Sequence, residues 1–263
     1  MFLKRTVSGI VLVAIAIVTI VFGGWILAAT LLLLSLIGMR EFYHASGVSG
    51  RGLNMLELAG YIGAVGYYIV LYFGLDRYIL LELAASCALI LAVYVFTFPE
   101  YHTQEVSAAF FGLFYVAVML GFIFLTRGRF KGRIEVWLIF FASWGADTCA
   151  YLVGVTMGRH KMSPKLSPKK SVEGAVGGIL GAAVLGAVYG AIFKQPVLMY
   201  MVICAAGAVI SIIGDLAASA VKRNANEKDF GKIIPGHGGI LDRFDSVIFT
   251  APVIYFLSLL ILG

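Results

Sequence analysis

Residues 222–246 form a polar strip in a chain that is otherwise largely apolar. The strip holds nine ionisable side chains and one histidine, whereas 61% of the residues in the whole chain are hydrophobic. The carboxylates of Asp229, Asp242 and Asp245 are hard oxygen ligands of the kind that Mg²⁺ binds. Five cations of the strip are suited to phosphate: Lys222, Arg223, Lys228, Lys232 and Arg243. This combination indicates a magnesium–phosphate site, although a solvated basic loop would have a similar composition.

Two further aspartates, Asp147 and Asp215, lie well inside apolar stretches. An ionised side chain in the middle of a bilayer costs about 3 kcal/mol, so such residues usually line a polar cavity. Asp215 shares one helix face with Ser211 and Ser219, which are four positions away on either side. Asp147 shares a face with Tyr151 in the same way. We predict that both aspartates face the interior of a helix bundle; the alternative is a position near the interface, hydrogen-bonded to a neighbouring helix.

A second basic segment, "SPKKSVEG", precedes an apolar run. Ser171 followed by Glu173 predicts a helix start, where acidic charge is favourable. Lys169 and Lys170 stand immediately before that start, and a helix N-terminus flanked by lysines is suited to binding an anion. An ordinary basic loop is the alternative. The glycines of "GHGG" at 236–239 would likewise let backbone N–H groups approach an anion closely.

Nine apolar windows make up most of the chain, at about 8–22, 24–38, 56–73, 79–98, 106–126, 136–157, 172–193, 197–220 and 245–262. Most have the length of roughly 17–25 residues that a helix needs to cross a bilayer. Because unpaired backbone groups cannot face lipid, we predict an all-α fold, a polytopic membrane bundle of about nine transmembrane helices. The Gly23–Gly24 pair is expected to separate the first two helices. A cleaved signal peptide is disfavoured, since no small-residue cleavage site follows the first run.

One predicted helix carries small residues at every fourth position: Gly174, Gly178, Ala182, Gly186 and Gly190. Such a stripe lets another helix approach closely, either within the bundle or at a dimer seam. The stripe predicts packing and says nothing of catalysis.

Positive charge is distributed unevenly between the two sides of the predicted bundle. Fourteen of the twenty Lys and Arg residues lie on the side of the N-terminus. Because such charge accumulates in cytoplasmic loops, we predict that the N-terminus and the polar strip face the cytoplasm. The basic loop "RGRFKGR" at 127–133 lies on the other side and departs from this pattern. No residue before about 130 is expected to do chemistry.

The strip from 219 to 246 resembles the signature of the CDP-diacylglycerol synthases, also called phosphatidate cytidylyltransferases. That signature is a serine, a Lys-Arg pair, a Lys-Asp pair, His-Gly-Gly, a spacer and Asp-Arg-x-Asp. The residues that match it are Ser219, Lys222, Arg223, Lys228, Asp229, His237, Gly238, Gly239, Asp242, Arg243 and Asp245. The segments "DTCAYLVG" (147–154) and "SPKKSVEG" (167–174) also look like the family, so the specific similarity covers roughly 144–246.

The resemblance implies a magnesium-dependent reaction in which CTP and phosphatidic acid give CDP-diacylglycerol and pyrophosphate. It also implies a homodimer, with metal at Asp215 and Asp242 and with Asp245 as a further candidate. Whether two metal ions or an added monovalent cation take part stays open. We expect the chemistry to involve Asp215, Lys222, Arg223, Asp242, Arg243 and Asp245. Substrate binding is expected at Asp147, Lys169, Lys170, Ser171, Glu173, Ser219, Lys228, Asp229, His237, Gly238 and Gly239.

These expectations predict two functional halves. Residues 1–130 would form an N-terminal transmembrane bundle, a scaffold that could give lipids access. Residues 131–263 would form the catalytic transmembrane domain, with loops that bind CTP and metal on the cytoplasmic side of the inner or plasma membrane. No nucleic-acid partner is expected.

The chemistry can also be argued from the reactants. A phosphate monoester has a second pKa of about 6, so the lipid is mostly a dianion at pH 7 and needs no general base. The obstacle is its repulsion from a triphosphate, which cations held by carboxylates would relieve. His237 is therefore expected to donate to a phosphate or to pin the loop rather than to act as a base.

Two other functions compete with this one. A CTP-dependent kinase of a polyprenol or similar lipid alcohol would direct a hydroxyl at the γ-phosphorus and would benefit from a base. An ion-coupled transporter would use Asp147 and Asp215 to bind protons or sodium near the midplane, but would leave the polar strip without a role. A P-loop is excluded, because the chain has no GxxxxGK[ST] sequence.

Overall fold

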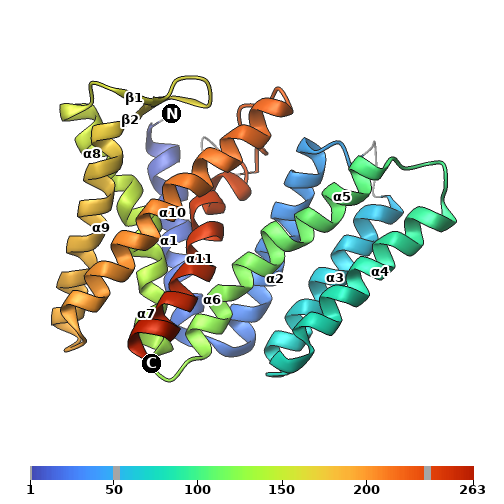
Figure 1. Cartoon of the computed structure of the whole chain (residues 1–263), viewed down its shortest axis with the longest axis horizontal. Coiled ribbons are helices and arrows are strands. Elements are labelled where there is room, and N and C mark those ends of the chain that lie inside the picture. Colours follow the sequence, from blue (N-terminus) through green and yellow to red (C-terminus); the bar gives the residue numbers. More distant parts are fainter. Residues whose placement is uncertain (1, 50–53, 234–237) are drawn as a thin grey trace. The chain divides into compact units, whose positions relative to one another are not determined.

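The computed structural model describes residues 2–49, 54–233 and 238–263, with side chains described from Gly9 onward. Within these residues the chain is helical apart from one two-stranded antiparallel hairpin (Figure 1). The elements in chain order are α1 (Phe2–Phe22), α2 (Gly24–Ala45), α3 (Met55–Tyr72), η1 (Asp76–Tyr78), α4 (Ile79–Phe96), α5 (Thr103–Gly112), η2 (Leu113–Val118), α6 (Met119–Gly128), α7 (Gly132–Phe140), η3 (Phe141–Gly145), α8 (Ala146–Met157), β1 (Lys161–Ser163), β2 (Ser167–Ser171), α9 (Val172–Ile192), α10 (Val197–Asn224) and α11 (Leu241–Leu262).

The predicted polytopic helical fold is confirmed. In the part of the chain that the structure describes, eight helical segments are long and apolar enough to span a membrane: Gly24–Ala45, Met55–Tyr72, Asp76–Phe96, Thr103–Gly128, Gly132–Met157, Val172–Ile192, Val197–Asn224 and Leu241–Leu262. The first predicted window corresponds to a shorter apolar stretch of α1, Gly9–Phe22. The break between α1 and α2 falls at Gly23, whose φ of 66° is in the left-handed region that glycine adopts readily.

The chain folds as two compact units, each considered by itself. Unit 1 consists of Met1–Phe124 and Asn224–Arg243, and unit 2 of Leu125–Arg223 and Phe244–Gly263. The central part of the polar strip therefore belongs to unit 1, whereas its two ends belong to unit 2. The division into a scaffold half and a catalytic half concerns function and stays a prediction.

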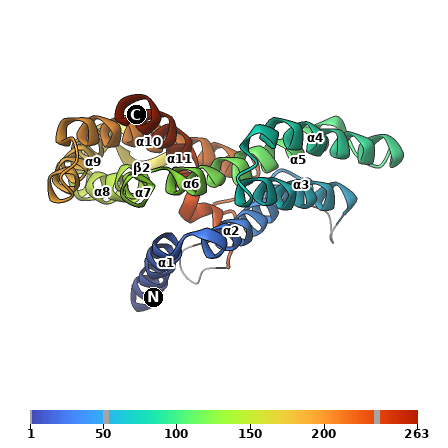
Figure 2. The same ribbon diagram turned by 90° about the horizontal axis from the view of Figure 1, so that it is seen from below.

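In unit 1, α3, α4 and α5 lie side by side in both views (Figures 1 and 2). Buried tyrosines join α3 and α5 to α2, because each hydroxyl finds a partner on another element. Tyr43 donates to the carbonyl of Ala109 over 2.8 Å, and the Tyr68 hydroxyl lies 2.9 Å from Ser35 Oγ. Gly112 makes room for the first of these rings, since a Cβ there would lie 2.5 Å from Tyr43 Cε1. These contacts hold α2 against α3 and α5, and α2 carries one residue of interest below.

In unit 2, the stripe of small residues on α9 is the packing seam predicted from its spacing, and all five members are buried. A Cβ on Gly174 would lie 2.8 Å from the Ala150 carbonyl oxygen of α8. A Cβ on Gly186 would lie 2.6 Å from the Tyr200 carbonyl oxygen of α10. The stripe thus brings α9 against α8 at one end and α10 at the other. It serves packing within the chain.

Candidate active site

Three aspartates of unit 2 gather from three helices. Asp147 lies in the first turn of α8, Asp215 lies toward the C-terminal end of α10, and Asp245 lies near the start of α11. Asp245 interacts electrostatically with Asp215, with Asp147 and with Lys222. Asp245 and Lys222 are each only 8% exposed. Asp147 and Asp215, which were predicted to face the bundle interior, are half-buried and lie beside the buried Asp245.

The same aspartates have specific side-chain partners. Lys170 Nζ forms an ion pair with Asp215 Oδ2. The Ser246 hydroxyl donates to Asp147 Oδ2 over 3.3 Å. The Asp215–Ser219 spacing predicted from the sequence gives only a long contact of 3.5 Å between Asp215 Oδ1 and the serine hydroxyl. We call the three aspartates with Lys170 and Lys222 the acid–lysine cluster; its carboxylates outnumber its lysines.

A cavity of about 460 Å³ opens beside this cluster. Its lining includes Asp147 and Asp215 together with three lysines of the hairpin, Lys161, Lys169 and Lys170. The volume lies in the range of pockets that hold small ligands. A lining that combines acids with lysines suits a ligand that carries both metal and phosphate.

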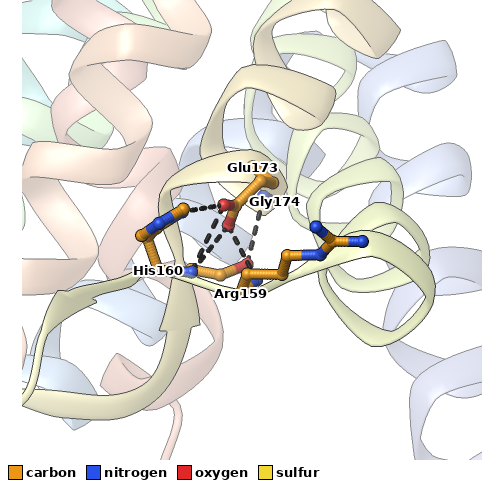
Figure 3. Close-up of polar contacts among 5 residues, drawn as sticks. Arg159, His160, Glu173 and Gly174 are labelled. Atoms are coloured by element: carbon orange, nitrogen blue, oxygen red, sulfur yellow. Dashed lines mark hydrogen bonds and ion pairs between the residues drawn. The ribbon is translucent and has the colours of Figure 1, made fainter.

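Local structure explains why the hairpin lysines reach this cavity. Ser171 caps α9 by accepting from the Gly174 N–H over 3.1 Å. The Glu173 carboxylate accepts from the Arg159 N–H at 3.0 Å and lies 2.5 Å from His160 Nδ1 (Figure 3). These contacts attach the beginning of the hairpin to the beginning of α9. Glu173 was predicted to bind substrate; in the structure its carboxylate holds the residues that precede the hairpin.

An irregular stretch of helix sets the position of Asp147. The π-helix η3 (Phe141–Gly145) lies between α7 and α8 and ends two residues before Asp147. Such wide turns inside α-helices are frequent at functional sites. No signal in the sequence indicated this segment.

In unit 1, the described part of the loop between α10 and α11 is held by the carboxylate of Asp242. We call residues 225–240 the signature loop. Asp242 Oδ2 accepts from the Phe230 N–H at 2.8 Å and from the Gly239 N–H at 2.9 Å. Gly238 has a φ of 87°, and a Cβ there would lie 2.7 Å from Asp242 Oδ2. The sequence predicted that these glycines let backbone N–H groups approach an anion. In the structure the Gly239 N–H donates to the carboxylate of Asp242.

The remaining predicted residues are placed as follows. Arg223, Lys228 and Asp229 are exposed, and Arg243 is partly buried at the start of α11. His237 lies outside the described residues. The predicted site residues therefore divide between the units, with Asp242, Arg243 and the glycines in unit 1 and the acid–lysine cluster in unit 2.

Comparison with known proteins assigns the family. A profile of the cytidylyltransferase family matches residues 3–261. The chain belongs to the cytidylyltransferase family. The match includes the N-terminal half, which the resemblance of 144–246 did not cover.

Relatives of this cytidylyltransferase-family chain share one name. The phosphatidate cytidylyltransferase of Staphylococcus saprophyticus is 30% identical over 257 residues, which cover 95% of this chain and 96% of the relative. That of Synechocystis sp. is 29% identical over 295 residues, covering 98% and 97%. That of Bacillus subtilis is 30% identical over 224 residues, covering 79% and 81%.

The donor atoms of this family member suit a hard divalent cation. Among the described residues no three His, Cys, Asp or Glu side chains are close enough to hold a metal by themselves. Mg²⁺ does not require such a set, because it usually takes one or two carboxylates and completes its shell with water and substrate phosphates. The buried Asp245 beside Asp215 and Asp147, with Lys170 paired to Asp215 and Lys222 near Asp245, fits that need.

Two polar residues close to the predicted site were missed from the sequence. Ser246 binds Asp147, and its only signal was its place directly after Asp245. Glu41 of α2 is 5% exposed and accepts from the backbone N–H groups at the start of α11. Its signal was an acid close to the end of an apolar run, beside Arg40.

Proposed function

We infer that this chain is a phosphatidate cytidylyltransferase, which converts CTP and phosphatidic acid to CDP-diacylglycerol and pyrophosphate. The observation that carries this inference is the similarity, along nearly the whole chain, to relatives of that name. The acid–lysine cluster provides a setting that suits the chemistry, because it combines buried carboxylates with cations beside a cavity. The protein is an integral membrane enzyme, since its spans are helical and apolar.

The reaction is a displacement at phosphorus. A phosphate oxygen of phosphatidic acid attacks the α-phosphorus of CTP, and the bond between that phosphorus and the oxygen of the β-phosphate breaks. Pyrophosphate leaves with the electron pair of this bond. The lipid phosphate is mostly dianionic at pH 7, so no residue has to remove a proton from it.

The residues are proposed to act chiefly on charge. Lys169 and Lys170 at the cavity, with Lys222 in the cluster, would lower the repulsion between the two anions. Asp215 and Asp242 are proposed as ligands of Mg²⁺, with Asp245 as a further candidate, and the ion when bound would neutralise phosphate charge. Ser171 and the N-terminus of α9 would orient a phosphate through backbone N–H groups.

The membrane arrangement is proposed to place the site at the cytoplasmic face of the inner or plasma membrane, in a homodimer. The excess of Lys and Arg in the loops on the side of the N-terminus supports this orientation. Labelling of single cysteines introduced at Lys165 and at Arg77 with an impermeant reagent tests it, since the hairpin should react only from the cytoplasmic side. Mass measurement of the detergent-solubilised protein tests the dimer.

Product analysis tests the activity itself. Purified protein with magnesium, phosphatidic acid and CTP labelled at the α- or γ-phosphate should place the α-label in lipid and release the γ-label in pyrophosphate. Release of CDP with transfer of the γ-label to a lipid alcohol would instead identify the kinase. Ion flux into liposomes without any dependence on CTP would identify the transporter.

A further inference from the structure

Glu41 joins two segments that are far apart in the sequence. It lies near the C-terminal end of α2, and its Oε1 accepts from the Ile240 N–H over 3.0 Å while Oε2 accepts from the Leu241 N–H over 2.8 Å. These donors stand at the start of α11, where no preceding helical turn supplies an acceptor. A carboxylate also complements the positive end of a helix. Glu41 therefore fixes where α11 begins.

Two glycines of the signature loop rest on the same carboxylate. A Cβ on Gly231 or on Gly239 would overlap the oxygens of Glu41. Neither glycine has a positive φ, so glycine is not required there by the backbone conformation. It is required because a side chain would occupy the space of the Glu41 carboxylate. Both described parts of the loop thus have a glycine against Glu41.

Asp242 completes this arrangement from inside α11. Its Oδ2 accepts from Phe230 and Gly239, the direct neighbours of the residues that touch Glu41. The side chain of Asp242 can accept from both N–H groups only while the start of α11 keeps its position relative to the loop. Glu41 supports this arrangement, because its carboxylate accepts from the helix start and lies against the loop glycines at once.

We propose that Glu41 is a positioning residue for cytidylyl transfer, which holds the signature loop and Asp242 in the arrangement that the reaction requires. This proposal rests on the proposed function. A carboxylate is needed because two N–H groups must be accepted at once. Glutamine has one acceptor and would point an NH₂ group at the other N–H, whereas aspartate is one methylene too short.

Glu41→Gln is the first test, with Glu57→Gln as its matched control. Glu57 is also a buried carboxylate of unit 1, 3% exposed, and it caps α3 by accepting from the Asn54 N–H. Both variants should lower the thermal midpoint. Only Glu41→Gln should lower kcat, by at least about tenfold in protein that remains folded, because small displacements of reacting groups have large effects on rate. Glu41→Asp keeps both acceptor oxygens on a shorter side chain, so it should retain more of the wild-type kcat than Glu41→Gln.

Gly231→Ala is the second test, and it leaves the carboxylate in place. Its methyl group should press on Glu41 and lower kcat, whereas Gly128→Ala has open space and should not. In a Glu41→Ala background, Gly231→Ala should have little further effect, because neighbours that act through one contact are not additive. The comparison of Gly231→Ala with Gly128→Ala decides the proposal if Glu41→Gln fails to fold, because both variants keep Glu41.

Three results would overturn the proposal. One is folded Glu41→Gln with the kcat and KM of the wild type; the second is a fall in kcat that Glu57→Gln reproduces; the third is full additivity of the changes at Glu41 and Gly231. In each case an active wild type leaves the proposed function standing. A wild-type chain that forms no CDP-diacylglycerol would reject both.

Discussion

In unit 1 the carboxylates of Glu41 and Asp242 accept from backbone N–H groups, whereas in unit 2 those of Asp147 and Asp215 bind side chains. Backbone donors keep their place as long as the fold persists. Side-chain partners such as Lys170, whose side chain is 27% exposed, can move to a new partner when a ligand arrives. The two sets of acids therefore differ in how easily they can exchange partners.

This difference suggests separate tasks for the two sets. The acids of unit 1 hold a loop and the start of a helix, and changing them should act mainly through geometry. In unit 2 three carboxylates lie close together beside lysines, and a bound divalent cation would relieve the repulsion among these carboxylates. Reaction chemistry is accordingly expected to depend most on unit 2.

Asp215→Asn should have the largest effect and is the strongest test of this contrast. We expect activity to fall by about a thousandfold, since the change removes the charge that would hold both Mg²⁺ and Lys170. Stability should change little, because the side chains of Asp215 and Lys170 are 24% and 27% exposed and water can reach both. Turnover assays over a magnesium titration, with thermal unfolding, measure the two effects.

The exposed acid of the η1 turn, Asp76, provides the control for that experiment. Asp76→Asn should keep the activity of the wild type. Near-normal turnover of Asp215→Asn at saturating magnesium would remove the metal role proposed for this residue.

Asp242→Asn separates holding a loop from binding a metal. The asparagine Oδ1 can still accept from Phe230 and Gly239, so the loop should keep its structure. If Asp242 also binds Mg²⁺, the lost charge should lower activity by about a hundredfold at a nearly unchanged thermal midpoint. Activity assays with unfolding curves measure this; full activity in a folded variant would leave Asp242 with the loop contact alone.

The fold was largely predictable, because each of its signals is local. Apolar windows indicated the helices, and the Gly23–Gly24 pair indicated the break between α1 and α2. Small residues at every fourth position predicted the seam from Gly174 to Gly190 along α9. The π-helix η3 was not predictable, since no residue type marks a wide turn.

The site was only partly predictable, for a physical reason. Asp147 and Asp215 were recognisable because a charge in an apolar run is costly unless it is paired. Glu41 was missed because its partners are backbone groups 199 and 200 residues away, and backbone donors leave no pattern in the sequence. Long-range contacts of this kind appear only in the folded chain.

Lys170→Met should have a smaller effect than either aspartate change. It removes the cation that pairs with Asp215 and lines the cavity. We expect the KM for CTP to rise by about tenfold, because the variant loses one charge-assisted hydrogen bond to the substrate. Steady-state kinetics at varied CTP measure it. Lys165→Met, at the exposed tip of the same hairpin, should leave KM unchanged; equal effects of the two would indicate general attraction by a basic hairpin.

Ser171→Ala should have the smallest effect. The Ser171 hydroxyl accepts from the backbone N–H of Gly174, just as the acids of unit 1 accept from backbone N–H groups. Loss of such a helix cap costs about 1 kcal/mol, so the thermal midpoint should fall by a few degrees. The KM for CTP should rise less than about threefold, since the lysines of the hairpin remain. Ser167→Ala, on the same strand, controls for the loss of a hydroxyl. A tenfold rise in KM at an unchanged midpoint would mean that Ser171 binds substrate directly, and the contrast between backbone-bound and side-chain-bound groups would then fail in unit 2.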